Sequence, residues 1–152
     1  MAKLYTMCGL PGAGKSTFAE NHKECIIVSS DAIRKELYGD ASIQGDGKRV
    51  FSIVDKRVKE ALENGFDVIY DATNLKASTR KSIINKFDAE HICVFVNTPK
   101  EECMKRNENR ERVVPMPVME RMFIQLTPPT VEEGFLKIIE INVWQINKGI
   151  IQ

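Results

Sequence analysis

The eight residues 9–16, with the sequence GLPGAGKS, constrain this chain more than any other stretch. They match the phosphate-binding pattern G-x-x-x-x-G-K-[ST], also known as Walker A, at every fixed position. The pattern is typical of the turn between a strand and a helix. Both flanks agree, because residues 4–8 favour a short buried strand and residues 16–20 favour the start of a helix. A glycine-rich turn followed by a chance lysine is the alternative, and it would leave the two flanks unexplained.

Each part of this motif has a physical reason in phosphate binding. The glycines let the backbone direct N–H groups at an anion and keep side chains out of its way. The helix that follows directs the positive end of its dipole at the same anion. Lys15 can reach the β- and γ-phosphates, and the Ser16 hydroxyl can ligate Mg²⁺. We therefore expect ATP or another nucleoside triphosphate, with Mg²⁺. The predicted nucleotide-binding residues of this loop are Gly9, Gly12, Ala13, Gly14, Lys15, Ser16 and Thr17.

The rest of the chain alternates short apolar runs with helical patterns. A continuous apolar run, as in a strand buried on both faces of a parallel sheet, occurs at 25–29. Residues 66–70 and 91–96 are the next predicted strands, and 137–143 can supply a further one. Between them, apolar residues recur at helical spacing. This alternation predicts a single α/β domain over residues 1–152, with a mostly parallel five-stranded sheet flanked by helices. In such a fold, the loops at the carboxyl ends of the strands form the site.

Composition limits the partners that the chain can have. The net charge of +1 is too small for a protein that coats nucleic acid, so a nucleic-acid substrate would be gripped locally, at an end. No apolar run approaches the roughly 18 residues that cross a bilayer, and we expect neither a membrane span nor a signal peptide. The four cysteines are scattered and lack metal-binding spacing. We expect reduced thiols and a cytoplasmic protein.

Two acidic residues follow predicted strands. Asp31 comes just after the run at 25–29, and Arg34 lies on the same helical face. The carboxylate could accept a proton from an attacking hydroxyl, and the arginine could hold an anion of the acceptor. A helix-capping aspartate in a surface salt bridge is an equal alternative on spacing alone. Asp71 ends the run at 66–70, where a carboxylate often holds Mg²⁺, although a turn or capping role would also fit.

Residues 106–117 are rich in charge and contain two prolines, which predicts a lid. Arg106 and Arg110 are one helical turn apart within it. An arginine that a lid brings to the site can stabilise the charge that phosphoryl transfer concentrates on the transferred group. The glutamates among these arginines also fit a solvated, salt-bridged helix end.

As a set, these motifs resemble the polynucleotide 5′-hydroxyl kinases of phage and bacteria. The matching segments, in chain order, are GLPGAGKS at 9–16, SDAIR at 30–34, DATN at 71–74, RNENR at 106–110 and VP at 114–115. The segment TPPTVEEGF at 127–135 is similar to one in related predicted kinases. The resemblance covers most of the chain.

The resemblance implies a P-loop kinase that transfers the γ-phosphate of ATP to the 5′-hydroxyl end of RNA or DNA. Lys15, Asp31 and Arg110 would be catalytic, with Asp31 as the general base. Arg110, with Arg106 as helper, would hold the donor phosphates. The substrate-binding residues would be Asp31, Arg34 on the acceptor's adjacent 3′-phosphate, Asp71 and Arg80, and the metal-binding residues would be Ser16 and Asp71.

Members of the resembled family are commonly fused to a phosphatase or ligase, but a D-x-D-x-T phosphatase signature is absent from this sequence, so removal of 3′-phosphates is not expected.

The residues also leave two other functions open. A kinase of a nucleoside, sugar or antibiotic hydroxyl would use the same Asp31 and would not need Arg34. A nucleotide-dependent switch would need neither.

Overall fold

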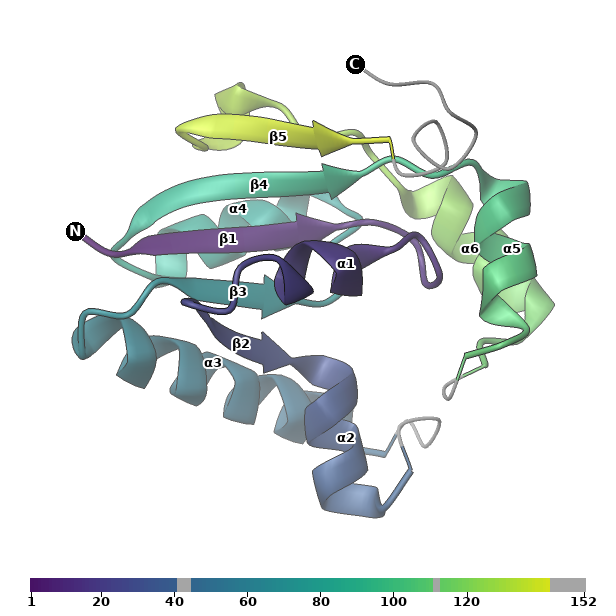
Figure 1. The fold of residues 1–152 in the computed structure, drawn as a ribbon, viewed down its shortest axis with the longest axis horizontal. Coiled ribbons are helices and arrows are strands. Elements are labelled where there is room, and N and C mark those ends of the chain that lie inside the picture. Colours follow the sequence, from purple (N-terminus) through teal and green to yellow (C-terminus); the bar gives the residue numbers. More distant parts are fainter. Residues whose placement is uncertain (41–44, 111–112, 143–152) are drawn as a thin grey trace.

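The computed structural model describes residues 1–40, 45–110 and 113–142. Its centre is a five-stranded sheet in the order β2-β3-β1-β4-β5, and every neighbouring pair is parallel (Figure 1). The sequence-based prediction of an α/β fold with a mostly parallel sheet is confirmed. The strands are β1 Lys3–Cys8, β2 Ile26–Ser29, β3 Val68–Asp71, β4 Glu90–Val96 and β5 Lys137–Ile141.

Helices cover both faces of this sheet and the region beyond the carboxyl ends of its strands (Figure 1). In Figure 1, α1 lies in front of the sheet, α4 lies behind it, and α5 and α6 lie beyond the strand ends. The helical elements are α1 Lys15–Glu20, α2 Ser30–Tyr38, α3 Gly47–Glu63, α4 Ala77–Lys86, α5 Lys100–Asn107, α6 Met116–Gln125 and the short 3₁₀ helix η1 Val131–Glu133.

The two largest of three hydrophobic clusters lie on opposite faces of the sheet. On β3, Val68 and Tyr70 pack with the valines of α3, whereas Ile69 between them packs with Phe18 of α1. This follows from strand geometry, because successive side chains point to opposite faces. The β3–β1–β4 centre of the sheet therefore packs apolar side chains on both faces, as is typical of a parallel sheet covered by helices.

One strand differs from the sequence-based prediction. The run at 25–29 is expected to be buried on both faces, yet Ile26 and Ile27 are 39% and 45% exposed. The reason is position, since β2 is an edge strand that pairs only with β3. An apolar run reports the strand but not its place in the sheet.

The start of α2 also differs from the prediction. Ser29, and not Asp31, caps this helix, because its hydroxyl oxygen accepts the Ala32 backbone N–H at 3.2 Å. Asp31 lies in the first turn, and its carboxylate is thereby available for other partners. Asp46 caps α3 in the same way, through the backbone N–H groups of Lys48 and Arg49.

Parts of two predicted segments lie outside the described residues: 111–112 of the predicted lid, and 143 of the predicted fifth strand. Within the described ranges, no helix has both the length and the apolar character that a bilayer crossing requires.

The buried centre of the sheet yields a stability prediction. Leu4 of β1 has no exposed surface, whereas Leu136 is 65% exposed. Leu4→Ala should lower the free energy of unfolding by about 2–5 kcal/mol, because it leaves a cavity between β1 and α3. Leu136→Ala, as the matched control, should change it by less than about 0.5 kcal/mol. Urea denaturation followed by circular dichroism measures both, and equal losses would contradict the placement of Leu4.

Candidate active site

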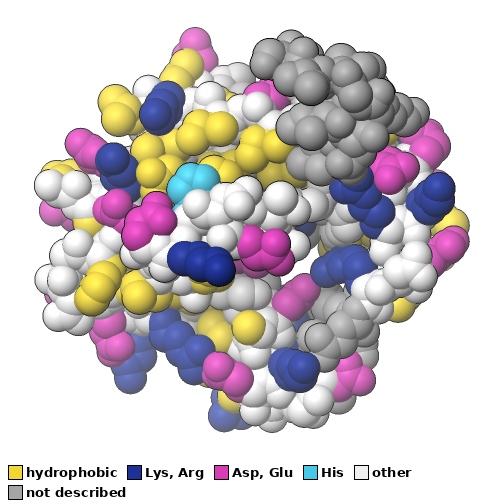
Figure 2. All heavy atoms as spheres, viewed as in Figure 1, with side chains coloured by type: hydrophobic (Ala, Val, Ile, Leu, Met, Phe, Trp, Pro, Cys, Tyr) yellow, Lys and Arg dark blue, Asp and Glu magenta, His cyan; other side chains and the backbone are white. Residues whose placement is uncertain are grey.

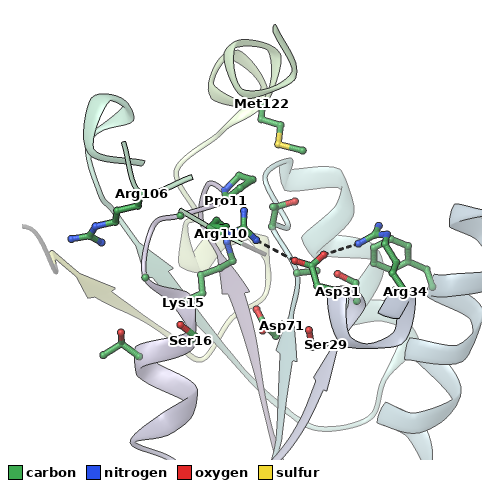
Figure 3. Close-up of a pocket in the computed structure, with 17 residues that line it drawn as sticks. Pro11, Lys15, Ser16, Ser29, Asp31, Arg34, Asp71, Arg106, Arg110 and Met122 are labelled. Atoms are coloured by element: carbon green, nitrogen blue, oxygen red, sulfur yellow. Dashed lines mark hydrogen bonds and ion pairs between the residues drawn. The ribbon is translucent and has the colours of Figure 1, made fainter. Parts of the chain in front are cut away.

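A pocket of about 730 Å³ opens at the carboxyl ends of the strands, between the turn after β1 and the segments around α2, α5 and α6. Figure 3 shows this pocket, and Figure 2 shows Lys and Arg side chains gathered over the α5 side of the molecule. Four basic and two acidic side chains line it, which leaves two positive charges for an anionic ligand. The lining residues named in the sequence analysis are Gly12, Gly14, Lys15, Ser16, Thr17, Asp31, Arg34, Asp71, Arg106 and Arg110.

The turn between β1 and α1 has the backbone that its glycines predict. Gly12 and Gly14 have φ values of +83° and +106°, which L side chains rarely adopt. A Cβ at Gly12 would also lie 2.7 Å from the carbonyl oxygen of Cys103 in α5, so this position excludes larger residues twice over. No side chain caps the start of α1 among the described residues. The Thr17 N–H donates to the Gly14 carbonyl oxygen at 3.2 Å, which leaves the N–H groups of the first two helical residues, Lys15 and Ser16, to face an anion.

Lys15 lies across the turn that it is expected to serve. Its Nζ donates to the carbonyl oxygens of Gly9 and Leu10, at 3.0 and 2.9 Å. Burial lowers the pKa of the Lys15 ammonium, and the nearby Asp71 carboxylate partly opposes this. A phosphate oxygen would replace these carbonyl oxygens as a stronger, charged acceptor.

Asp31 lies between two arginines (Figure 3). Its Oδ1 accepts from Nη1 of Arg34 at 3.0 Å, and its Oδ2 accepts from Nη2 of Arg110 at 3.2 Å. Arg34 comes from the same helix, three residues on, whereas Arg110 comes from the turn after α5. The carboxylate therefore connects the two sides of the pocket mouth.

The Arg34 side of the pocket is partly apolar. The Arg34 guanidinium lies 5.8 Å from the centre of the Phe51 ring of α3, and Phe51 lines the pocket. Met122 of α6 enters from the other wall (Figure 3). Sequence reasoning missed Phe51 and Met122, because at helical spacing each looks like an ordinary core position.

The two predicted lid arginines lie differently. Nη1 of Arg110 is buried and has no hydrogen-bond partner among the described residues. Arg106 points away from Asp31 (Figure 3), donating to Glu102 at 3.1 Å and to the carbonyl oxygen of Ala13 at 3.3 Å. Arg106 therefore holds the phosphate loop from outside, together with the Thr98 hydroxyl, which donates to the same oxygen at 2.7 Å.

Asn107 was missed as a functional residue and explains how the turn with Arg110 is held. Its amide donates to the Val114 carbonyl oxygen at 2.7 Å and accepts from the Val114 N–H at 3.0 Å. This pair of bonds joins the two ends of the segment that carries Arg110. The available signal was the segment RNENR at 106–110, which contains Asn107 and on which the family resemblance partly rests.

Asp71 is the last residue of β3, at the carboxyl end of the strands, where it pairs in register with Ser29 of β2, and it lines the pocket. Burial raises the pKa of its carboxyl, and the nearby Lys15 ammonium partly opposes this. The Ser16 hydroxyl lines the same pocket. Hydroxyl and carboxylate oxygens are the ligands that Mg²⁺ prefers, so these residues fit a magnesium ion beside bound phosphates.

Three predicted site residues do not line the pocket: Gly9 and Ala13 of the phosphate loop, and Arg80, which lies away from that loop. Arg80 has no exposed surface, and its guanidinium forms an ion pair with Glu133 at 2.7 Å.

A phosphate-binding loop at the edge of a parallel sheet, with arginines and a carboxylate around the phosphate position, defines a P-loop kinase. The chain belongs to the family described as an AAA domain, whose model matches residues 4–129. The relatives described next differ in the acceptors that their names give.

The chain is similar to a tRNA kinase and to a chain of an RNA repair complex. The chain is 32% identical over 143 residues to the L-seryl-tRNA(Sec) kinase of Methanococcus maripaludis, covering 83% of this chain and 53% of that protein. It is 27% identical to a chain of the solved Pnkp1/Rnl/Hen1 RNA repair complex, with a TM-score of 0.74, covering 82% of this chain and 44% of that one. A gluconokinase from Sinorhizobium meliloti, 19% identical with a TM-score of 0.67, covers 97% of this chain and 86% of its own, and shares the fold. The chain spans about half the length of the first two relatives.

The raised pKa of Asp71 predicts a pH-dependent stability. The folded-state pKa of Asp71 lies above the ordinary value of 3.8, so between these two pKa values the native protein binds more protons than the unfolded chain. The stability of the protein therefore falls as the pH rises from 3.8 through the folded-state pKa. Asp71→Asn removes this ionisation. The variant should therefore be more stable than the wild type at pH 7. The difference should shrink as the pH falls from the raised folded-state pKa toward the ordinary value of 3.8, and it should level off below that value.

Urea denaturation at a series of pH values measures this difference. Asp88→Asn, at an exposed position, is the control and should change the free energy of unfolding by less than about 0.5 kcal/mol throughout. A gain for Asp71→Asn that does not vary with pH would contradict the assignment.

Proposed function

We propose that this chain is an ATP-dependent kinase that transfers the γ-phosphate to the 5′-hydroxyl end of RNA or DNA. The observation that carries the proposal is the position of Asp31 between Arg34 and Arg110 at the mouth of the phosphate pocket. A carboxylate held there can reach an acceptor hydroxyl on one side and a donor phosphate environment on the other. A nucleotide-dependent switch has no need of such a carboxylate.

In the proposed reaction, Asp31 accepts the proton of the acceptor hydroxyl as that oxygen attacks the γ-phosphorus. The new oxygen–phosphorus bond forms as the bond to the β–γ bridging oxygen breaks, and ADP leaves with the released electron pair. Arg110 now donates to Oδ2 of Asp31. We propose that it moves onto the donor phosphates when ATP binds, which frees that oxygen to accept the proton.

Lys15 and the N–H groups of the phosphate loop would hold the β- and γ-phosphates. Ser16 and Asp71 would hold Mg²⁺, which neutralises charge on the phosphates and orients them. Arg106 supports this arrangement through its bond to the Ala13 carbonyl oxygen, and so acts on the loop. Arg34 would grip a phosphate of the acceptor through its guanidinium group, beside the Phe51 ring.

The comparisons support a nucleic-acid acceptor and favour a second candidate of the same kind. The RNA repair complex supports action on an RNA end. The seryl-tRNA kinase, by its name, acts on a hydroxyl that an RNA carries, so transfer to a seryl group on tRNA is the second candidate. Both candidates use the same donor site and differ in what the Arg34 side must accommodate.

Two further proposals concern the setting of this activity. We propose that residues 1–152 act as one kinase domain whose lid lies at about 106–117. We also propose a cytoplasmic location, since the four cysteines are buried and none is in a disulfide among the described residues.

The acceptor is tested by γ-phosphate transfer from labelled ATP with Mg²⁺. The acceptors are 5′-hydroxyl oligonucleotides of RNA and DNA with and without the adjacent 3′-phosphate, seryl-tRNA, and a panel of nucleosides and sugars. We expect transfer to the oligonucleotides. Asp31→Asn should lower kcat by about 10²–10⁴-fold, because the general base is lost.

Arg34→Ala should weaken the use of oligonucleotides by roughly tenfold or more, and only for acceptors that carry the 3′-phosphate, because a charge-assisted contact is lost. Arg57→Ala, which removes an exposed arginine that does not line the pocket, is the control and should leave transfer unchanged. Transfer to seryl-tRNA alone would establish the second candidate. Transfer only to nucleosides or sugars would contradict both nucleic-acid proposals.

A further inference from the structure

No residue of the segment 127–135 lines the pocket. This segment nevertheless contains Glu133, one partner of the most buried ion pair among the described residues. The pair joins Glu133 of η1 to Arg80 of α4, with side chains 5% and 0% exposed. Nε of Arg80 donates to Oε1 of Glu133 at 2.7 Å, and Nη2 donates to Oε2 at 3.0 Å. This bidentate geometry orients the guanidinium as well as neutralising it.

Glu133 is itself held in place by the turn that carries it. Its Oε2 accepts the backbone N–H of Thr130 at 3.1 Å, and Thr130 and Glu133 form a capping box around η1. Burial opposes the charge on Glu133, but the hydrogen bonds from Arg80 and from the Thr130 N–H outweigh it and lower the pKa of the carboxyl. The pair is therefore ionised and rigidly placed.

The remaining corner of the Arg80 guanidinium reaches the loop that follows β3. Nη1 donates to the carbonyl oxygens of Asn74 and Leu75, both at 2.9 Å. Two successive carbonyl groups thus turn toward one cation. The loop bends sharply to allow this, because Asn74 has a φ of +44°, the only positive value of a non-glycine residue in the described ranges. The Asn74 amide donates to the Met7 carbonyl oxygen at 2.8 Å and fixes the bend against β1.

This loop connects directly to two parts of the nucleotide site. The carbonyl oxygen of Thr73 accepts the backbone N–H of Gly9, the first residue of the phosphate loop, at 3.0 Å. Asp71, the proposed magnesium ligand, immediately precedes the loop on β3. A displacement of residues 72–75 would therefore move both the start of the phosphate loop and the Asp71 carboxylate.

Stability alone does not account for a pair of this kind. Replacing a buried ion pair by apolar residues of similar volume is often neutral or stabilising, because the desolvation of two charges offsets their attraction. The additional donors of Arg80 to the Asn74 and Leu75 carbonyl oxygens are what an apolar replacement would lose. These two hydrogen bonds hold the backbone of the loop that follows β3.

We propose that Arg80 and Glu133 are positioning residues for the nucleotide site, which set Asp71 and Gly9 through the loop 72–75. The inference replaces the substrate-binding role that the sequence predicts for Arg80. It rests on the proposed magnesium role of Asp71 and is independent of the acceptor. It also gives a role to the segment 127–135, which the proposed kinase reaction does not otherwise use.

The test uses the 152-residue chain and two measurements, the urea midpoint of unfolding and the affinity for ATP by calorimetry, with and without Mg²⁺. The variants are Arg80→Met/Glu133→Leu, which removes the pair without leaving a lone charge, and Glu133→Gln, which preserves shape and weakens the hold on Arg80. The matched control is Arg57→Met/Glu36→Leu, because Arg57 and Glu36 form a bidentate pair of the same chemistry that is exposed and does not line the pocket.

We expect the Arg80→Met/Glu133→Leu variant to fold, with a urea midpoint lowered by the loss of the donors to the Asn74 and Leu75 carbonyl oxygens. Its affinity for ATP with Mg²⁺ should fall about tenfold or more, because residues that support a metal ligand typically contribute 10–100-fold. Its affinity without Mg²⁺ should fall less, and the control pair should change neither value. Wild-type affinity for ATP with Mg²⁺ in this variant would overturn the proposal and leave the pair a purely structural role.

Two results keep the test decisive. If the double variant does not fold, Glu133→Gln carries the decision, and a folded Glu133→Gln protein that binds ATP with Mg²⁺ as the wild type does would likewise overturn the proposal. If the wild type transfers phosphate to no oligonucleotide but binds ATP, the proposed acceptor has failed, and the positioning role is still decided by the affinities.

Discussion

The turn between β1 and α1 must keep its backbone N–H groups free for an anion, and much of the surrounding structure follows from this constraint. A loop that reserves N–H groups for a ligand has fewer of them with which to hold its own shape. Within the loop, the Ala13 N–H and the Lys15 ammonium donate to the Leu10 carbonyl oxygen, at 3.0 and 2.9 Å, and other groups of the loop are held from outside. Thr98 and Arg106 donate to the Ala13 carbonyl oxygen, and Thr73 accepts from Gly9. The loop also packs closely against α5: a Cβ added to Gly12 would lie 2.7 Å from the Cys103 carbonyl oxygen.

The same constraint shapes the electrostatics of the pocket. A site for a triphosphate gathers cations that repel one another before the ligand arrives. Lys15 is balanced by two backbone carbonyl oxygens and by Asp71, and Arg110 is balanced by Asp31. These partners are the groups that the proposed reaction needs in other roles, as metal ligand and as base. Binding of the donor would therefore exchange internal ion pairs for phosphate contacts, which links occupation of the donor site to release of the base.

Distant segments of the chain contribute to this site by way of the loop after β3. Arg80 and Glu133 are 53 residues apart in sequence. Their ion pair holds the loop that follows Asp71, the last residue of β3. Asn107 and Val114 play a comparable part for the turn that carries Arg110. In both cases a polar side chain holds backbone groups of a loop, and the loop carries the residue that faces the pocket. Positioning by this means leaves the pocket itself lined by groups that are available to ligands.

The sequence by itself determined the phosphate loop, the alternation of strands and helices, the parallel sheet, and the group of charged residues at the strand ends. These features depend on local patterns, such as glycine spacing and continuous apolar runs, which act over a few residues. Only the tertiary structure decided that β2 is an edge strand, that Ser29 caps α2 while Asp31 pairs with two arginines, and that Arg80 is buried against Glu133. The physical reason is that edge position, burial and the choice among several charged partners depend on which segments meet in space, and no spacing along the chain records that.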